Sequence, residues 1–393
     1  MRTLGLYLHI PFCRSKCLYC DFCSLPNRSD EVIERYTSRL CGDVAAWGER
    51  CREYAVDTVF FGGGTPTLLN ERQLSRIMEA VHAAFRVAPD AEITAECNPA
   101  TGGRDLFRTM RRAGFNRLSI GLQSAHSREL KALGRLHDFD GFLRTWEEAR
   151  EAGFDNLNAD VMFGVPYQTR DSFLRTLESV TALRPEHLSA YALSLEEGTP
   201  LARMADRLPM PDEDETAAMY RDAVAFLAGQ GLEQYEISNF ARAGYQSRHN
   251  RKYWNAEEYL GLGPAAHSDL GGVRSGNSRD VDAYLRGEDV TAERSEPSRQ
   301  ERENEYVMLR MRLCEGLDCA AFRERFGHAP EAFAERLEGY VASGFVRRTA
   351  GGFAFTVDGF LVSNTILSDV VSFSGEESDG KSEKNLDKSE KIV

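Results

Sequence analysis

The chain has 393 residues, 42% of them hydrophobic, and a formal net charge of -13. This length predicts two or three domains with a sizeable core. The acidic balance argues against general nucleic-acid affinity, because binding to a phosphate backbone needs a basic surface. No apolar run approaches the roughly 18 residues of a membrane span, and the N-terminus lacks the pattern of a signal peptide.

The nine cysteines, an odd number, do not form a disulfide framework. Three of them are clustered near the N-terminus, and the others are scattered along the chain. This usage is typical of a reduced chain, so we expect a cytoplasmic protein.

Strand-like apolar segments alternate with helix-like segments through the first half of the chain. The six strand candidates are residues 4–10, 56–61, 92–97, 117–122, 157–163 and 188–195. The helical patterns cover residues 29–50, 71–85, 104–112, 128–133, 139–152 and 171–183. Such alternation predicts an α/β fold with a parallel sheet and covering helices. Six units are too few for a full eight-fold barrel, so residues 1–205 are expected to form a partial (β/α)6 TIM-like barrel.

The remainder of the chain is less regular. Residues 206–295 are interpreted as a connecting region, which holds the segment His249-Asn250-Arg251-Lys252-Tyr253-Trp254. Residues 296–373 show short helices and a two-stranded stretch at Phe345–Thr356, which predicts a smaller C-terminal α+β, winged-helix-like domain. Because the chain is acidic, we expect that domain to be structural or partner-facing rather than DNA-binding. Residues 374–393 are rich in Ser, Glu, Asp and Lys and are expected to be disordered.

Three cysteines directly after the first strand form the pattern Cys13-x3-Cys17-x2-Cys20. Three thiolates on one tight loop can hold three irons of a [4Fe–4S] cube, which normally takes four cysteine ligands. One iron would then keep an open position for a small molecule. Two other interpretations stay open. A structural zinc would need a fourth ligand, from Cys23 or His9, and a redox dithiol would use only Cys17 and Cys20.

Polar and glycine-rich segments follow several predicted strands, and in a parallel α/β sheet function gathers at these strand ends. The triplet Gly62-Gly63-Gly64 would let backbone amides approach a ligand closely, although a tight turn explains it equally well. Four polar or charged residues follow near the next strand ends: Glu96, Gln123, Arg135 and Asp160. One such residue could cap a helix, but several at one mouth are typical of a cradle for a polar ligand.

Two sets of motifs are shared with a known family. The first comprises the three cysteines, Tyr19 before the last of them, and Gly62-Gly63-Gly64-Thr65-Pro66. The second comprises Tyr7-x-His9-Ile10-Pro11-Phe12-Cys13, Cys20-Asp21-Phe22, Glu96-x-Asn98-Pro99, Ser119-Ile120-Gly121-x-Gln123-Ser124, Tyr235-Glu236-Ile237-Ser238-Asn239-Phe240 and His249-Asn250-x-x-Tyr253-Trp254. With these motifs the chain resembles radical S-adenosylmethionine (SAM) proteins, and specifically their HemN/HemW branch, over most of its length.

The resemblance implies a set of cofactors and contacts. Cys13, Cys17 and Cys20 would ligate a [4Fe–4S] cluster, and SAM would chelate the fourth iron through its amino and carboxylate groups. The residues that match the SAM contacts of the family are Tyr7, Gly63, Gly64, Thr65, Glu96, Gln123, Arg135 and Asp160. One electron from a donor would cleave SAM to methionine and a 5′-deoxyadenosyl radical. The cofactor supplies the difficult chemistry, and the protein positions it and keeps water away.

Two kinds of protein in this branch must be separated. The oxidase converts coproporphyrinogen III to protoporphyrinogen IX. It typically carries a further cysteine two residues after the third, and an N-terminal segment before the barrel. Here Phe22 takes that position, Cys23 lies one place later, and the chain starts shortly before Cys13. These departures fit the heme chaperones of the branch, which are thought to bind heme and hand it to acceptor proteins.

We therefore expect a SAM- and [4Fe–4S]-dependent heme chaperone that transfers heme to respiratory-chain enzymes. An electron donor and peripheral contact with a membrane are further expectations. An oxygen-independent coproporphyrinogen III dehydrogenase is the main alternative, and a protein whose cluster only reports redox state is a third.

His249 is the candidate heme ligand, because imidazole is a common axial ligand of heme iron. Tyr253 and Trp254 would supply flat apolar surface for the macrocycle. From chemistry alone, the favoured interpretation is a histidine satisfied by a local hydrogen bond, with the aromatic residues in the core. With the family resemblance, heme is expected to bind at these three residues.

Overall fold

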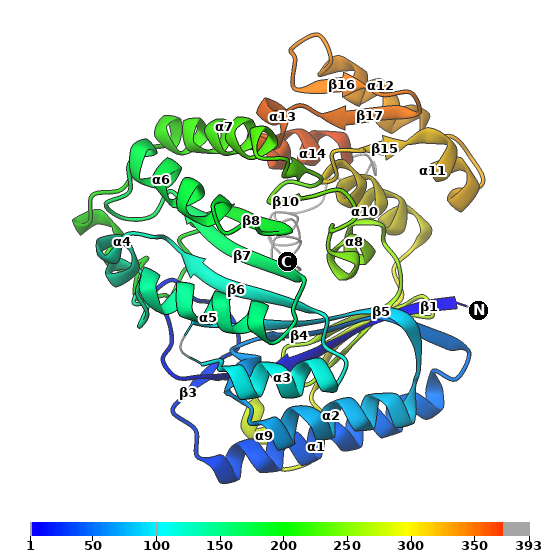
Figure 1. Ribbon diagram of the computed structural model, residues 1–393. Coiled ribbons are helices and arrows are strands. Elements are labelled where there is room, and N and C mark those ends of the chain that lie inside the picture. Colours follow the sequence, from blue (N-terminus) through cyan, green and yellow to red (C-terminus); the bar gives the residue numbers. More distant parts are fainter. Residues whose placement is uncertain (1, 100, 372–393) are drawn as a thin grey trace.

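The computed structural model describes residues 2–99 and 101–371 (Figure 1). These residues form an α/β fold in which helices cover a large sheet, with a smaller α+β part packed beside it. The tail 374–393, which was expected to be disordered, lies outside the described residues. Among the helices of the described ranges, none is long and apolar enough to cross a bilayer.

Six parallel strands form the centre of the large sheet and confirm the predicted partial barrel. They run in the order β1-β4-β5-β6-β7-β8. Their bounds are Arg2–Ile10 (β1), Tyr54–Gly63 (β4), Arg86–Cys97 (β5), Arg117–Gln123 (β6), Asn156–Phe163 (β7) and His187–Ala192 (β8). The intervening helices are Asp30–Arg50 (α1), Glu71–Ala84 (α2), Arg104–Arg112 (α3), Ser127–Ala132 (α4), Phe139–Glu151 (α5) and Arg170–Thr181 (α6).

Side-chain caps explain where several covering helices begin. Ser29, Asn70 and Thr169 each accept a backbone hydrogen bond at the start of α1, α2 and α6. In α2 and α6 the side chain of the third helical residue also accepts a hydrogen bond from the backbone amide of the cap residue, so two otherwise unpaired amides are satisfied. Each cap is worth about 1 kcal/mol, and it fixes the point at which the chain turns from a strand end into a helix.

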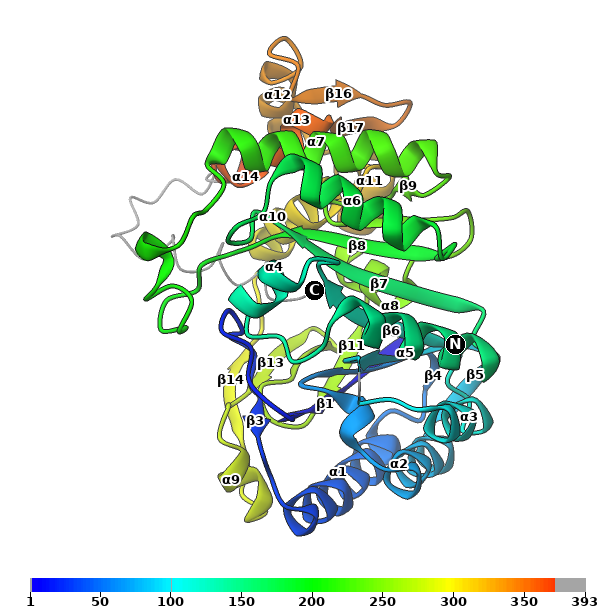
Figure 2. The ribbon, with the colours of Figure 1, turned by 60° about the vertical axis from the view of Figure 1, so that its left-hand side comes forward.

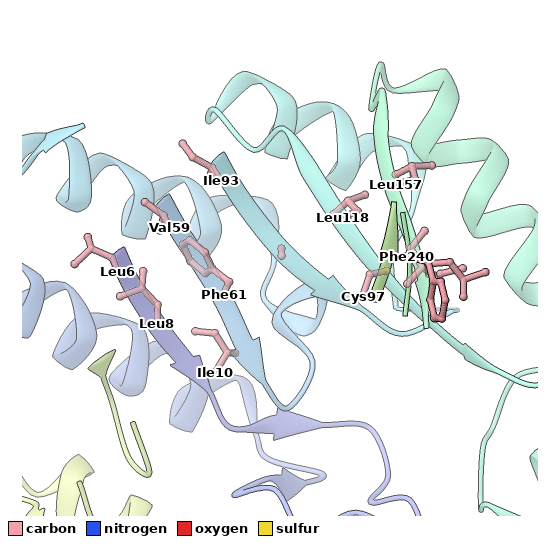
Figure 3. Close-up of a cluster of buried hydrophobic side chains, with 14 of the residues drawn as sticks. Leu6, Leu8, Ile10, Val59, Phe61, Ile93, Cys97, Leu118, Leu157 and Phe240 are labelled. Atoms are coloured by element: carbon pink, nitrogen blue, oxygen red, sulfur yellow. The ribbon is translucent and has the colours of Figure 1, made fainter. Parts of the chain in front are cut away.

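Alternation along the strands separates an apolar outer face, part of which Figure 3 shows, from a polar interior. On β1, Leu6, Leu8 and Ile10 are fully buried and belong to the main apolar core. Tyr7 and His9 point to the opposite face, because successive side chains of a strand alternate. The inner face also carries polar side chains from the other strands, among them Thr58, Glu92, Ser119, Asn158 and His187. The residues that could carry chemistry therefore share one side of the sheet.

The sheet continues beyond these six strands, through residues that were expected to form a connecting region. β9 (Glu233–Gln234) and β10 (Asn239–Ala241) extend it next to β8. On the other side, β11 (Tyr259–Leu262) runs parallel to β1. It is followed by β12 (His267–Leu270), β13 (Val273–Asn277) and β14 (Thr291–Ser295). These strands were not predicted from the sequence, because they are short and most lack apolar alternation. The predicted domain boundaries at residues 205 and 295 stay predictions.

Helices complete the same region and the C-terminal part. They are Glu213–Gly229 (α7), Arg248–Trp254 (α8) and Val281–Leu285 (α9), then Arg299–Met311 (α10), Cys319–Phe326 (α11), Glu331–Gly339 (α12), Val357–Leu361 (α13) and Ser363–Val371 (α14). The C-terminal part also holds a small sheet in the order β15-β17-β16, with bounds Leu317–Asp318 (β15), Val346–Arg348 (β16) and Gly352–Phe355 (β17) (Figure 2). The antiparallel pair β16-β17 is the predicted two-stranded stretch. Its apolar residues join the same core cluster as those of the barrel.

Phe61 offers a test of the packing between the sheet and its helices. It is fully buried on β4, with its ring centroid 4.9 Å from that of Phe115. We expect Phe61→Ala to lower the free energy of unfolding by about 3–5 kcal/mol, because it removes apolar contacts and leaves a cavity. Chemical denaturation measures this. The control Val362→Ala, at a side chain that is 37% exposed, should change stability by about 0.5 kcal/mol or less. Equal effects of the two substitutions would contradict the described packing.

Candidate functional site

The three predicted cluster cysteines lie on one loop that follows β1. Cys13 belongs to the short strand β2 (Phe12–Cys13), which pairs with β3 (Leu25–Pro26) and closes the base of the loop. The amide of Cys20 donates to the carbonyl of Cys17 at 3.2 Å, which tightens the turn between them. The loop therefore holds its three thiols, all partly buried, in one place.

Burial shapes the protonation of these thiols. It raises the pKa of Cys13, and it raises that of Cys20 to about 11. Electrostatic repulsion from the neighbouring Cys17 is a smaller cause that also raises the pKa of both thiols. Thiolate is the metal-binding form of cysteine, so bound iron would have to stabilise the deprotonated groups here.

Neither candidate for a fourth zinc ligand is directed at the three cysteines. His9 is buried, and its ring nitrogens are hydrogen-bonded to Tyr7 Oη at 3.1 Å and to the Cys23 carbonyl at 2.9 Å. The Cys23 thiol donates to the carbonyl of Arg279 at 3.5 Å. Within residues 2–99 and 101–371, no three His, Cys, Asp or Glu side chains are grouped to hold one metal ion. The donor set fits three separate irons of a cluster better than a single zinc ion.

The glycine turn after β4 is bonded directly to the cysteine loop. The amide of Gly64 donates to the carbonyl of Ile10 at 2.9 Å, and that of Thr65 donates to the carbonyl of Phe12 at 2.7 Å. The Thr65 hydroxyl also lies 3.6 Å from Cys13 Sγ. The turn and the loop therefore form one unit at the mouth of the barrel.

Close approach explains why this turn contains glycine. Gly63 has a φ of 105°, which side-chain-bearing residues rarely adopt, and a Cβ there would overlap the ring of His9. A Cβ on Gly64 would lie 2.6 Å from the carbonyl oxygen of Phe12. The two positions therefore exclude any larger residue.

Two carboxyl groups lie inside the barrel beneath the glycine turn. Glu96 Oε2 accepts a hydrogen bond from the amide of Gly63 at 3.0 Å. Asp160 accepts from Ser119 Oγ at 3.1 Å and from Asn158 Nδ2 at 2.6 Å, and it lies within β7 rather than at its end. Burial, together with the weaker effect of repulsion from Asp160, raises the pKa of Glu96 to about 8. Such a pair would be stabilised by a ligand that brings positive charge or hydrogen-bond donors.

Arg135 brings the opposite charge to the same mouth. Its guanidinium donates to Asn98 Oδ1 at 2.6 Å, to the carbonyl of Gly121 at 2.7 Å and to Cys17 Sγ at 3.4 Å. Asn98 Nδ2 in turn donates to Thr65 Oγ1 at 2.7 Å. Asn98 was quoted in a motif but was not among the predicted contacts. Its position directly after β5 is the signal that could have identified it.

Gln123 has an unusual backbone conformation and a buried side-chain acceptor that a ligand could satisfy. It ends β6 with a φ of 67°, it is 3% exposed, and its Oε1 has no hydrogen-bond partner among the described residues. A buried acceptor without a partner costs about 1–3 kcal/mol, so such atoms commonly mark a binding site. The predicted SAM contacts that gather around this mouth are Tyr7, Gly63, Gly64, Thr65, Glu96, Gln123, Arg135 and Asp160.

The predicted heme residues lie in α8, nearer the beginning of the strands. His249 is 1% exposed, and its ring nitrogens are hydrogen-bonded to Thr58 Oγ1 at 2.9 Å and to Tyr253 Oη at 2.9 Å. The amides of Arg248 and His249 donate to the Glu92 carboxylate at 3.0 Å. Burial lowers the pKa of His249 to about 3, so its imidazole is neutral.

This geometry leaves neither nitrogen of His249 free for iron. An axial bond to heme would require one of its two hydrogen bonds to break. Trp254 is 3% exposed and packs with Leu309 and Leu313 in a separate apolar cluster. The heme assignment of His249, Tyr253 and Trp254 stays a prediction, and the geometry favours the alternative of a histidine satisfied by local hydrogen bonds.

A partial parallel barrel with three loop cysteines and a glycine turn at its mouth defines a protein of the radical SAM type. The family model for the radical SAM superfamily matches residues 7–180, and the model for the HemN C-terminal domain matches residues 298–362. The structure of coproporphyrinogen III oxidase (HemN) from Escherichia coli superimposes with a TM-score of 0.83 at 24% identity. That match covers 95% of this chain and 91% of the oxidase chain, and it shows the fold.

Relatives that match nearly the whole chain identify its family within the radical SAM superfamily. The heme chaperone HemW of Bacillus subtilis (strain 168) is 33% identical, over 92% of this chain and 97% of the relative. The heme chaperone HemW of Escherichia coli (strain K12) is 33% identical, over 93% and 97%. That of Mycobacterium tuberculosis (strain ATCC 25618 / H37Rv) is 34% identical, over 93% and 94%. The chain belongs to the HemN/HemW family of radical SAM proteins, a membership that implies SAM and a [4Fe–4S] cluster as cofactors.

Glu96 predicts a pH dependence of stability. Its folded pKa of about 8 lies above the ordinary value of 4.5, so the folded chain keeps a proton that the unfolded chain loses in this window. Stability therefore falls as the pH rises from the lower value to the higher. We expect Glu96→Gln, which retains an oxygen acceptor for Gly63, to become progressively more stable than the unsubstituted chain across the window. Denaturant midpoints at its two ends measure this, and a constant difference would contradict the raised pKa.

Substitution of His249 is expected to lower stability without a comparable loss of heme affinity. We expect His249→Ala to lower the free energy of unfolding by about 1–3 kcal/mol, because Thr58 and Tyr253 lose a buried partner. His249→Gln, which can keep one of the two bonds, should recover part of that loss. Heme affinity, measured by absorbance titration of the folded variants, should change by about twofold or less. A large loss of heme affinity at unchanged stability would instead support His249 as the axial ligand of the heme iron.

Proposed function

We propose that this chain is a heme chaperone that binds heme and hands it to acceptor proteins such as respiratory-chain enzymes. The observation that carries the proposal is similarity over nearly the whole chain to several proteins named heme chaperone HemW, at 33–34% identity. The proposal includes a donor that supplies electrons to the cluster, and peripheral contact with a membrane where the acceptors reside.

The mouth of the barrel is the proposed cofactor site. Cys13, Cys17 and Cys20 would hold the [4Fe–4S] cluster, since they are thiols on one closed loop beside a glycine turn. The eight polar and glycine residues around the mouth would hold SAM. When bound, the two cofactors supply one-electron chemistry.

The chain's own side chains prepare this site for such a ligand. The guanidinium of Arg135 donates to Cys17 Sγ at 3.4 Å and offers positive charge to a carboxylate. Glu96 and Asp160 offer acceptors to an amine or a hydroxyl, and Gln123 Oε1 has a buried acceptor to spare. Phe60 stacks on Tyr7, with ring centroids 6.1 Å apart, in the interior beneath the mouth.

Anaerobic heme titration followed by transfer to an apo-cytochrome tests the proposed function. We expect the reconstituted chain to take up heme and pass it on. Cys13→Ala/Cys17→Ala/Cys20→Ala should lose its iron and with it the transfer. Cys41→Ala, at a partly buried thiol outside the loop, is the matched control and should retain both.

Two results would contradict the proposal. One is a reconstituted chain that fails to bind or deliver heme. The other is formation of protoporphyrinogen IX from coproporphyrinogen III, SAM and a reductant, which would support the oxidase function instead. Transfer that is unaffected by loss of the three cysteines would separate the chaperone role from the cluster.

A further inference from the structure

A cavity of about 290 Å³ lies beside the cysteine loop, apart from the hydrogen-bonded environment of His249. Four segments of the chain supply its walls. The lining side chains used below are Leu18 of the loop, Arg128 and Lys131 of α4, and Tyr167, Met204 and Leu208 from the segments after β7 and β8. Figure 2 shows α4 beside the blue segment that carries the cysteines.

Backbone hydrogen bonds hold this wall to the cluster loop. The amide of Leu18 donates to the carbonyl of Leu133 at 3.0 Å, at the end of α4. The amide of Leu201 donates to the carbonyl of Leu18 at 2.9 Å. Because Leu18 lies between Cys17 and Cys20, a ligand in the cavity would touch the same loop that carries the cluster thiols.

The lining combines positive charge with apolar surface. The guanidinium of Arg128 lies over the ring of Tyr167, 4.0 Å from its centroid. Neither Arg128 nor Lys131 forms an ion pair with another residue of the described ranges. Met204 is 41% exposed, although it is a large apolar side chain. In a chain of net charge -13, two unpaired cations beside exposed apolar groups favour an amphipathic anion.

We propose that this cavity docks one edge of a heme whose carboxylates pair with Arg128 and Lys131 and whose ring lies on the apolar wall. Met204 supplies a thioether, which is a known class of axial heme ligand. The inference rests on the proposed heme-chaperone function and gives that function a site that leaves the hydrogen bonds of His249 intact. A cavity of this size encloses only part of the macrocycle, which suits a ligand that must be released to an acceptor.

Heme titration of the reconstituted chain and of Arg128→Glu/Lys131→Glu tests the site. We expect the double variant to bind heme about tenfold more weakly or worse, because two attractive charges become repulsive. Heme dimethyl ester, in which the carboxylates are blocked, should bind both proteins alike. Arg175→Glu, at an exposed arginine on α6 that does not line the cavity, is the matched control and should bind heme normally. Met204→Leu should keep most of the affinity but shift the heme absorption bands.

The outcomes distinguish this site from the proposed function itself. Equal heme affinity of the double variant and the unsubstituted chain would overturn the site while leaving the chaperone function in place. Loss of heme affinity in His249→Ala but not in the double variant would overturn the cavity site and favour a heme site at α8. The double variant could bind heme as well as the unsubstituted chain while its cluster is reduced more slowly by an acidic redox protein. That result would overturn the heme site and show that the cavity is a protein-docking surface. An unsubstituted chain that binds no heme would contradict the chaperone function as well.

Discussion

Two backbone hydrogen bonds, from Gly64 to Ile10 and from Thr65 to Phe12, join the glycine turn to the cysteine loop. The two segments can approach this closely only because Gly64 carries no side chain, since a Cβ there would lie 2.6 Å from the carbonyl oxygen of Phe12. This contact fixes the three thiols against the ends of the first two barrel strands. Arg135 and the carboxyl of Glu96 then reach the same place from neighbouring strands and turns. The chemistry of the site therefore depends on a backbone constraint before it depends on any charged group.

The interior of the barrel separates this mouth from α8. Phe60 stacks between Tyr7 and His249, with ring centroids 6.1 Å and 5.2 Å away. His249 in turn packs against Tyr253, and both are held by hydrogen bonds within the core. In this packed column His249 and Tyr253 are both buried, so a macrocycle would have no open access to the imidazole. A heme-handling protein of this structure would therefore need a site on its surface, and the cavity beside Leu18 lies next to the cluster loop.

Local patterns in the sequence predicted the barrel and the cysteine loop, because strand periodicity, glycine turns and cysteine spacing are all encoded within short segments. The strands β11 to β14 escaped prediction, since they are short and are stabilised by pairing with β1 and with one another. For His249 the sequence favoured a local hydrogen bond, which Tyr253 supplies, but its second partner Thr58 lies far away in the chain and could not be predicted. The cavity lined by Arg128 and Met204 was also not predicted, because four segments of the chain must fold together to form it.

The central claim is that three cysteines leave one iron of a cluster open for SAM. Mössbauer spectroscopy of anaerobically reconstituted protein tests it most directly. The account predicts a [4Fe–4S] cube in which one iron site is distinct and changes its parameters when SAM is added. Four equivalent irons that ignore SAM, or a zinc ion held by four side chains in place of the cluster, would contradict it.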